Sequence, residues 1–140
     1  MTERVFVDSN ILVYAHDRGA GERHAVARDL VLELWRERAG VVSTQVLQET
    51  YVNIRRKAAH PLSIAEARTL LQDYLVWKLV VIDGAAIIEA THFEERYGLA
   101  FWDALIVGAA NLSGAQTLLT EDLNHGQRYG RVKAHNPFRG

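Results

Sequence analysis

The sequence predicts an α/β fold in which a parallel β-sheet of four to five strands is flanked by helices on both faces. One observation is that the strands predicted over residues 4–7, 79–82 and 116–119 are apolar without alternation, which is typical of a sheet covered on both faces. Another is that such strands alternate with longer segments of helical periodicity. Finally, a chain of 140 residues with 49% hydrophobic content and no repeat or linker predicts one domain over residues 1–140.

The first half of the chain predicts two strands and four helices. Gly40 is a suitable stop for one helix, Thr44 a suitable cap for the next, and Pro61 breaks that next helix. Ser63 and Glu66 have the spacing of a capping box. The predicted elements are a strand over 4–7, a short helix from Asn10, a helix over 22–39, a strand over 41–43, a helix over 44–58 and a helix from 63 to about 77.

The second half predicts further strands and two more helices. Asp83 is the expected N-cap of a helix that ends near Gly98, and Gly114 ends the helix over residues 99–113. Strands are expected over 79–82, 116–119 and 132–134, with the loop "TEDLNHG" between the last two.

Composition excludes several classes of protein. The chain has no cysteine, which excludes disulfide frameworks, zinc–thiolate sites and thiol catalysis. Its net charge of -1 is not that of a globally basic nucleic-acid coat. No apolar stretch approaches the roughly 20 residues of a membrane span, and the start "MTERVF" lacks the features of a signal peptide. We therefore expect a cytoplasmic protein without a membrane partner.

Acidic residues follow three of the predicted strands, where sites of parallel sheets lie. Asp8 follows "VFV", Asp122 follows "TLLTE" and Asp83 follows "LVVI". Each alone is more often a cap or loop residue than a catalytic one, so this placement is not diagnostic.

Two further acids differ in how strongly the pattern marks them. Asp103 is the only charged residue of "LAFWDALIVGAANLS", a segment that is apolar or small around its whole circumference. A buried carboxylate is normally paired, protonated or bound to metal, so a site and a structural ion pair are both open. Glu49 lies opposite the stripe formed by Leu47, Tyr51 and Ile54, which by itself favours a solvated surface side chain.

In this order, Asp8, Glu49, Asp103 and Asp122 resemble the acidic quartet of PIN-domain ribonucleases, most closely the VapC toxins of type II toxin–antitoxin pairs. Four segments carry the resemblance: "VFVDSNILVYAHD", "STQVLQETYVN", "FWDALIVGAA" and "LLTEDLNHGQ". The terminal "VKAHNPF" is also similar to the end of many such toxins. The motifs extend from residue 5 to residue 138, and the resemblance therefore covers nearly the whole chain.

The resemblance implies a Mg²⁺- or Mn²⁺-dependent endonuclease that hydrolyses RNA phosphodiester bonds. Asp8 and Asp103 would be the principal metal ligands, and Asp122 would bind a metal directly or through water. Glu49 would bind a second ion or orient the nucleophilic water. Clustered carboxylates repel one another, and a hard divalent cation relieves that repulsion.

Other residues are expected to support these acids or to hold RNA. Ser9, Asn10 and Thr120 are candidates for hydrogen bonds to the metal ligands, although capping explains Ser9 equally well. Arg55, Arg56 and Lys57 form a charged run that we consider as a contact for RNA phosphates. A run of this kind is more often a solvated surface. The resemblance also implies a small VapB-like antitoxin and a homodimer, to which Trp35 and Trp77 contribute unless they lie in the core.

Two other functions remain open from the sequence. One is a haloacid-dehalogenase-like phosphatase with Asp8 as covalent nucleophile, but Asn10 stands where such an enzyme has a second aspartate. The other is a binding scaffold with this fold and a lapsed site, against which the presence of all four acids argues.

Overall fold

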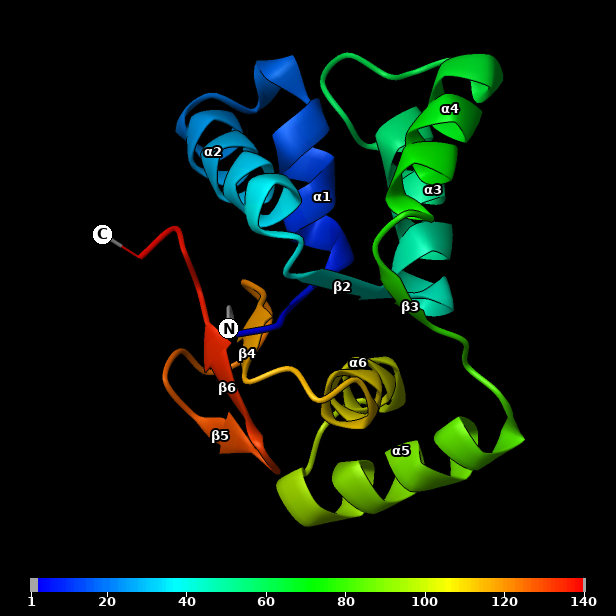
Figure 1. Cartoon of the computed structure of the whole chain (residues 1–140), viewed down its shortest axis with the longest axis vertical. Helices are drawn as coiled ribbons and strands as arrows, with labels where there is room; N and C mark the ends of the chain where they lie inside the picture. Colours follow the sequence, from blue (N-terminus) through cyan, green and yellow to red (C-terminus); the bar gives the residue numbers. More distant parts are fainter. Residues whose placement is uncertain (1–2, 140) are drawn as a thin grey trace.

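The computed structural model describes residues 3–139 and contains, within them, six α-helices, one short 3₁₀ helix and six strands (Figure 1). The strands are β1 (Val5–Val7), β2 (Gly40–Ser43), β3 (Lys78–Val80), β4 (Thr117–Leu119), β5 (Arg128–Tyr129) and β6 (Val132–His135). The helices are α1 (Ser9–His16), α2 (Glu22–Glu37), α3 (Thr44–Arg56), α4 (Ile64–Tyr74), α5 (Gly84–Tyr97) and α6 (Phe101–Leu112), and the 3₁₀ helix is Arg18–Ala20.

The strands form one sheet in the order β3-β2-β1-β4-β6-β5, and every pair except β5–β6 is parallel. The prediction of a parallel α/β sheet is confirmed, but the strand count of four to five is wrong. The unpredicted strand is β5, which pairs Tyr129 with Val132 across a tight turn. Gly130 in this turn has φ 66°, a conformation that favours glycine. A strand of two residues has no apolar run that a sequence pattern can detect.

The helices cover the sheet on two sides, as Figure 1 shows: α1 and α2 lie above it in that view, and α5 and α6 lie below. The apolar strands supply the centre of the core, where Phe6, Val41, Val42 and Leu118 are fully buried. Residues 104–110 of α6 are buried throughout, as its apolar circumference predicts. Among the residues described, no helix is both long and apolar enough to cross a membrane.

The N-caps of two helices lie one residue earlier than the sequence predicts. Asp8, in extended conformation, is the N-cap of α1, so that Ser9 and Asn10 lie inside the helix. Ser43 is the N-cap of α3, and its hydroxyl accepts the Val46 amide at 3.2 Å. Thr44, the predicted cap, instead accepts the amide of Ile82 through its hydroxyl at 3.1 Å. Ser43, the last residue of β2, therefore caps α3, and the Thr44 hydroxyl binds the segment that follows β3 instead.

Gly40 does not end α2, contrary to the prediction. The helix ends at Glu37, and Arg38 takes the left-handed conformation with φ 55°. Gly40 is the first residue of β2, where a Cβ would come within 2.4 Å of the Trp77 ring. Glycine is therefore needed here for close packing and not for a helix stop.

The remaining caps agree with the sequence. Ser63 and Glu66 form the predicted capping box, although the helix that they begin ends at Tyr74 and not near residue 77 as predicted. Asp83 accepts the amide of Ala86 at 2.9 Å and begins α5. That helix ends at Tyr97, and its predicted stop Gly98 is the C-cap with φ 64°. These caps depend on residues that are close in sequence, which explains why the sequence predicts them.

Trp35 and Trp77 belong to the core and not to an exposed face. Trp77 is 7% exposed, and Trp35 packs partly buried against the same cluster. The two indole rings lie 5.3 Å apart between centroids, and Tyr74 lies 4.9 Å from Trp77. The suggestion that these tryptophans lie in the core is confirmed.

Candidate acidic site

Asp8 is the most buried of the four predicted acids, with 5% of its surface exposed. It follows the central strand β1, and its Oδ1 accepts the Ser9 amide at 2.7 Å. Its Oδ2 accepts the hydroxyl of Thr120 at 2.8 Å. Burial raises the pKa of Asp8 to about 7, helped by the charges of Asp122 and Glu49 and opposed by the Thr120 and Ser9 hydrogen bonds. This carboxyl is therefore costly to ionise without a nearby positive charge.

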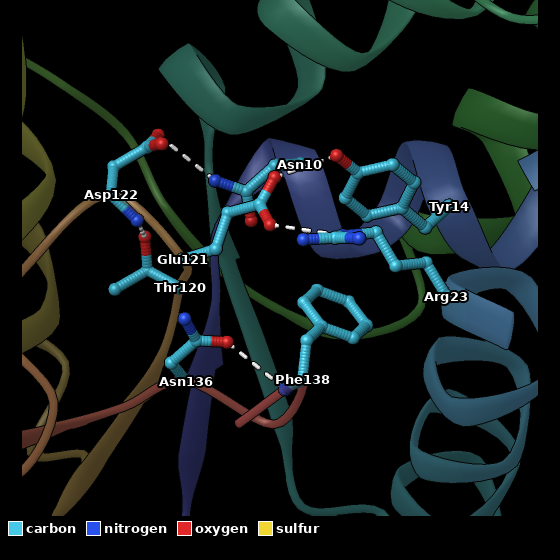
Figure 2. Close-up of polar contacts among 8 residues, drawn as sticks. All are labelled: Asn10, Tyr14, Arg23, Thr120, Glu121, Asp122, Asn136 and Phe138. Atoms are coloured by element: carbon cyan, nitrogen blue, oxygen red, sulfur yellow. Dashed lines mark hydrogen bonds and ion pairs between the residues drawn. The ribbon is translucent and has the colours of Figure 1, made fainter. Parts of the chain in front are cut away.

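Asp122 reaches the same edge of the sheet from the loop after β4. Its amide donates to the Thr120 hydroxyl at 3.1 Å, and that hydroxyl in turn donates to Asp8. Its Oδ2 accepts the Asn10 side-chain amide at 2.9 Å, as Figure 2 shows. Thr120 and Asn10 therefore connect the carboxylates of the first and fourth motifs, although 112 residues separate Asn10 from Asp122.

The neighbouring Glu121 is engaged by a different pair of residues. Its Oε1 accepts the Tyr14 hydroxyl at 2.6 Å and its Oε2 accepts Arg23 Nε at 3.3 Å (Figure 2). Burial, followed by the hydrogen bond to Glu121, raises the pKa of Tyr14 to about 12, so the hydroxyl stays a donor at neutral pH. The structure thus separates the two adjacent acids: Glu121 lies with Tyr14 and Arg23, and Asp122 with Asn10.

Glu49 is half-buried on α3, contrary to the solvated position that helical periodicity alone favours. Its Oε1 accepts the Ser9 hydroxyl at 3.4 Å. Burial raises the pKa of Glu49, and the charges of Asp103 and Asp122 add to this, whereas hydrogen bonds from Gln45 and Ser9 lower it. The apolar stripe of α3 packs into the protein while the edge that carries Glu49 faces the first motif.

Asp103 lies in the first turn of α6 and is half-buried. Burial raises its pKa, and the charge of Asp122 raises it further. Gln45 on α3 donates its side-chain amide to the backbone carbonyl of Trp102 at 3.2 Å, which ties the helices that carry Glu49 and Asp103 to each other. Asp103 therefore belongs to the same electrostatic group, and the buried remainder of α6 anchors it.

All four acids interact electrostatically, and Asp122 is the neighbour that the other three share. Over residues 3–139, however, no three His, Asp or Glu side chains are arranged closely enough to hold an ion. The chemistry of the donors nevertheless fits a hard divalent cation, because the candidate ligands are all oxygen atoms. Asn10 Oδ1 is also buried and finds no hydrogen-bond partner within the described part of the chain. The residues present thus fit Mg²⁺ or Mn²⁺ in ligand type.

The predicted RNA-binding run lies at the far end of α3. Arg56 and Lys57 are exposed, whereas Arg55 is half-buried with its guanidinium 5.6 Å from the Tyr51 ring centroid. Over residues 3–139, these three side chains form no hydrogen bond or ion pair with the acids, and their role stays a prediction.

The sequence patterns did not connect Tyr14 or Arg23 with Glu121. Tyr14 follows Asn10 by four residues on α1, so helical spacing alone would have placed both on one face. Arg23 has no such signal, since it comes from a different helix and meets Glu121 only in the folded chain.

The structure is thus an α/β protein in which four acidic side chains act on one another's charge near the carboxyl ends of its central strands. The family model of the PIN domain matches residues 5–130. The chain therefore belongs to the PIN domain family. Membership rules out the haloacid-dehalogenase-like alternative. No curated protein matches this chain.

Solved structures agree with this fold. The toxin–antitoxin complex from Klebsiella pneumoniae is similar with 22% identity and a TM-score of 0.67, over 96% of this chain and 98% of that one. DNA-bound VapBC from Salmonella typhimurium has 15% identity and a TM-score of 0.66, covering 97% and 99%. VapC20 of Mycobacterium tuberculosis, a toxin that cleaves the sarcin–ricin loop, has 20% identity and a TM-score of 0.61, covering 81% and 86%.

Proposed function

We propose that this protein is a divalent-metal-dependent endoribonuclease and the toxin of a toxin–antitoxin pair. The single observation that carries the proposal is the convergence of Asp8, Glu49, Asp103 and Asp122 in one electrostatic group within a PIN domain. Burial raises the pKa values of Asp8, Glu49 and Asp103, and such shifted acids are typical of functional sites. The similar structures include toxins and toxin–antitoxin complexes, which supports the same assignment.

The residues of the chain divide the work of the reaction as follows. Asp8 and Asp103 are the candidate ligands of Mg²⁺ or Mn²⁺, with Asp122 as a further ligand. A cation bound there supplies positive charge that acidifies a water molecule and offsets charge on the phosphorane-like transition state. Glu49 accepts a proton from the nucleophilic water or orients that water. Thr120 and Ser9 keep the carboxylates of Asp8 and Glu49 directed toward the site.

We also propose an antitoxin partner and a homodimer. Several similar structures are toxin–antitoxin complexes, which supports the antitoxin. Because Trp35 and Trp77 lie in the core, a dimer has to use other apolar side chains. The large exposed ones of the second half of the chain include Val81, Ile88 and Trp102, which are 63%, 62% and 64% exposed. We propose exposed apolar side chains such as these as the candidates for the dimer contact.

A cleavage assay with purified protein tests the enzymatic proposal. RNA is incubated with Mg²⁺ or Mn²⁺, with and without chelator, using wild type, Glu49→Gln and the control Glu33→Gln, whose acid lies exposed on α2. We expect metal-dependent cleavage that Glu49→Gln lowers by about 100-fold, because the variant removes the carboxylate proposed to act on the nucleophilic water. Glu33→Gln should leave the rate unchanged. A metal-replete wild type that cuts no RNA would instead support a lapsed scaffold. The toxin role fails if expression harms no cell, or if a short protein encoded next to it does not relieve that harm.

A further inference from the structure

Glu121 has no part in the proposed chemistry, yet both oxygens of its carboxylate are engaged. The Tyr14 hydroxyl donates to Oε1 at 2.6 Å and Arg23 Nε donates to Oε2 at 3.3 Å (Figure 2). Tyr14 belongs to α1 and Arg23 to α2. The loop after β4 is thereby attached to two helices that are remote from it in sequence.

Arg23 is itself held in place by two aromatic rings. Its guanidinium carbon lies 5.7 Å from the centroid of Tyr14 and 5.2 Å from that of Phe138. The two rings meet edge to face at 5.3 Å. Phe138 donates its amide to the Asn136 side chain at 3.0 Å, which fixes the C-terminal segment beside Arg23. The Arg23 guanidinium, which donates to Glu121, is therefore restrained by its packing against the rings of Tyr14 and Phe138.

Asp122, the next residue, is the one of the four acids whose position is least fixed by burial. It is exposed, and its charge acts on Asp8, Glu49 and Asp103 together. Mutual repulsion favours an outward movement of its loop. Asn10 and Thr120 each oppose that movement with one hydrogen bond. The engagement of Glu121 adds a restraint that is directly coupled to Asp122 through the backbone.

We infer that Glu121 is a positioning residue, which together with Tyr14 and Arg23 holds the loop after β4 so that Asp122 faces the other acids. This consequence for catalysis rests on the proposed function. The positioning itself is measurable in protein without metal or RNA, because the Asp122 amide donates to Thr120 and its hydrogen exchange reports on the loop.

The experiment compares Glu121→Ala, Glu121→Gln, Tyr14→Phe and Arg23→Met with wild type. The matched control is Arg28→Met, which removes an exposed ion pair to Asp29 on the same helix as Arg23. We expect Glu121→Ala and Tyr14→Phe to speed exchange of the Asp122 amide by about tenfold and to weaken calorimetric Mn²⁺ binding by about tenfold to 100-fold. In cleavage, kcat falls while KM for RNA stays within about twofold. Glu121→Gln keeps an acceptor for Tyr14 and recovers part of the loss.

The inference is overturned if Glu121→Ala and Tyr14→Phe match Arg28→Met in amide exchange and Mn²⁺ affinity. It is also overturned if Arg23→Met weakens RNA binding and lowers its salt dependence while the Asp122 amide is unaffected, because Arg23 is then a phosphate ligand. Tyr14→Phe removes a single hydroxyl, so its result stands even where Glu121→Ala unfolds the protein. If wild type cuts no RNA but the amide responds as expected, the proposed function fails and the positioning role holds.

Discussion

The ends of β1 and β3 are alike in sequence and differ in chemistry. Each strand leads to an aspartate that caps the next helix, Asp8 directly after β1 and Asp83 three residues after β3. Asp8 accepts the Ser9 amide at 2.7 Å, and Asp83 accepts the Ala86 amide at 2.9 Å. Asp8 is buried and also accepts the Thr120 hydroxyl, whereas Asp83 is exposed. A carboxylate at a strand end is therefore not sufficient for a site.

The position of each strand in the sheet explains the difference. β1 lies between β2 and β4, so Asp8 accepts the hydroxyl of Thr120 after β4 and is affected by the charge of Glu49 on the helix after β2. β3 is an edge strand with one neighbour. The chemistry at the carboxyl edge thus depends on how many polar strand ends converge there, as expected for open α/β sheets.

The largest expected effect is on RNA cleavage. We expect Asp8→Asn to lower the cleavage rate by about 100- to 1,000-fold, because it removes a charge needed to hold the cation and stabilise the transition state. Asp83→Asn preserves a capping side chain and should change the rate by less than about twofold. Initial rates are measured at saturating Mn²⁺ on one RNA.

Equal losses in the two variants would erase the distinction between the strand ends. Circular dichroism of both proteins shows whether a lost rate reflects a lost fold. An active Asp8→Asn protein would contradict the metal-ligand assignment.

Most of the fold was predictable because it depends on local patterns. Capping signals placed the start of α4 and both ends of α5, and unbroken apolar runs placed β1 and β4. The patterns failed where tertiary contacts decide, as at Gly40, which the Trp77 ring requires, and at the two-residue strand β5.

The site was less accessible from residue patterns than the fold. Burial of its helix marked Asp103, but the helical wheel placed Glu49 on the surface, and only the family resemblance selected it. The contacts among Tyr14, Arg23 and Glu121 join distant segments, so no local pattern marks them. Their recognition required the three-dimensional structure.

The second effect concerns stability against pH in metal-free protein. The pKa of Asp8 is raised from 3.8 to about 7, so the folded state resists ionisation that the unfolded chain undergoes freely. Wild type therefore loses stability as the pH rises from about 4 to about 7. Asp8→Asn removes this loss, and its stability advantage over wild type should grow by about 3 kcal/mol across that range.

Urea unfolding in chelator at pH 4, 6 and 8 measures this difference. Thr120→Val provides a change in the opposite direction, because the Thr120 hydrogen bond lowers the pKa of Asp8. That variant should lose more stability toward neutral pH than wild type does. A difference between Asp8→Asn and wild type that is constant with pH would contradict the raised pKa.

The smallest effect is expected at the end of β3. Asp83→Ala removes the acceptor for the Ala86 amide and should lower the free energy of unfolding by about 1 kcal/mol, while Asp83→Asn retains most of the cap. Urea unfolding measures both variants, and cleavage of the same RNA should proceed at the wild-type rate in each. A loss of cleavage without a loss of stability would mean that Asp83 acts on the substrate despite its distance along the sheet from β1. Stability changes alone would leave Asp83 as a helix cap and Asp8 as the strand-end acid with a chemical role.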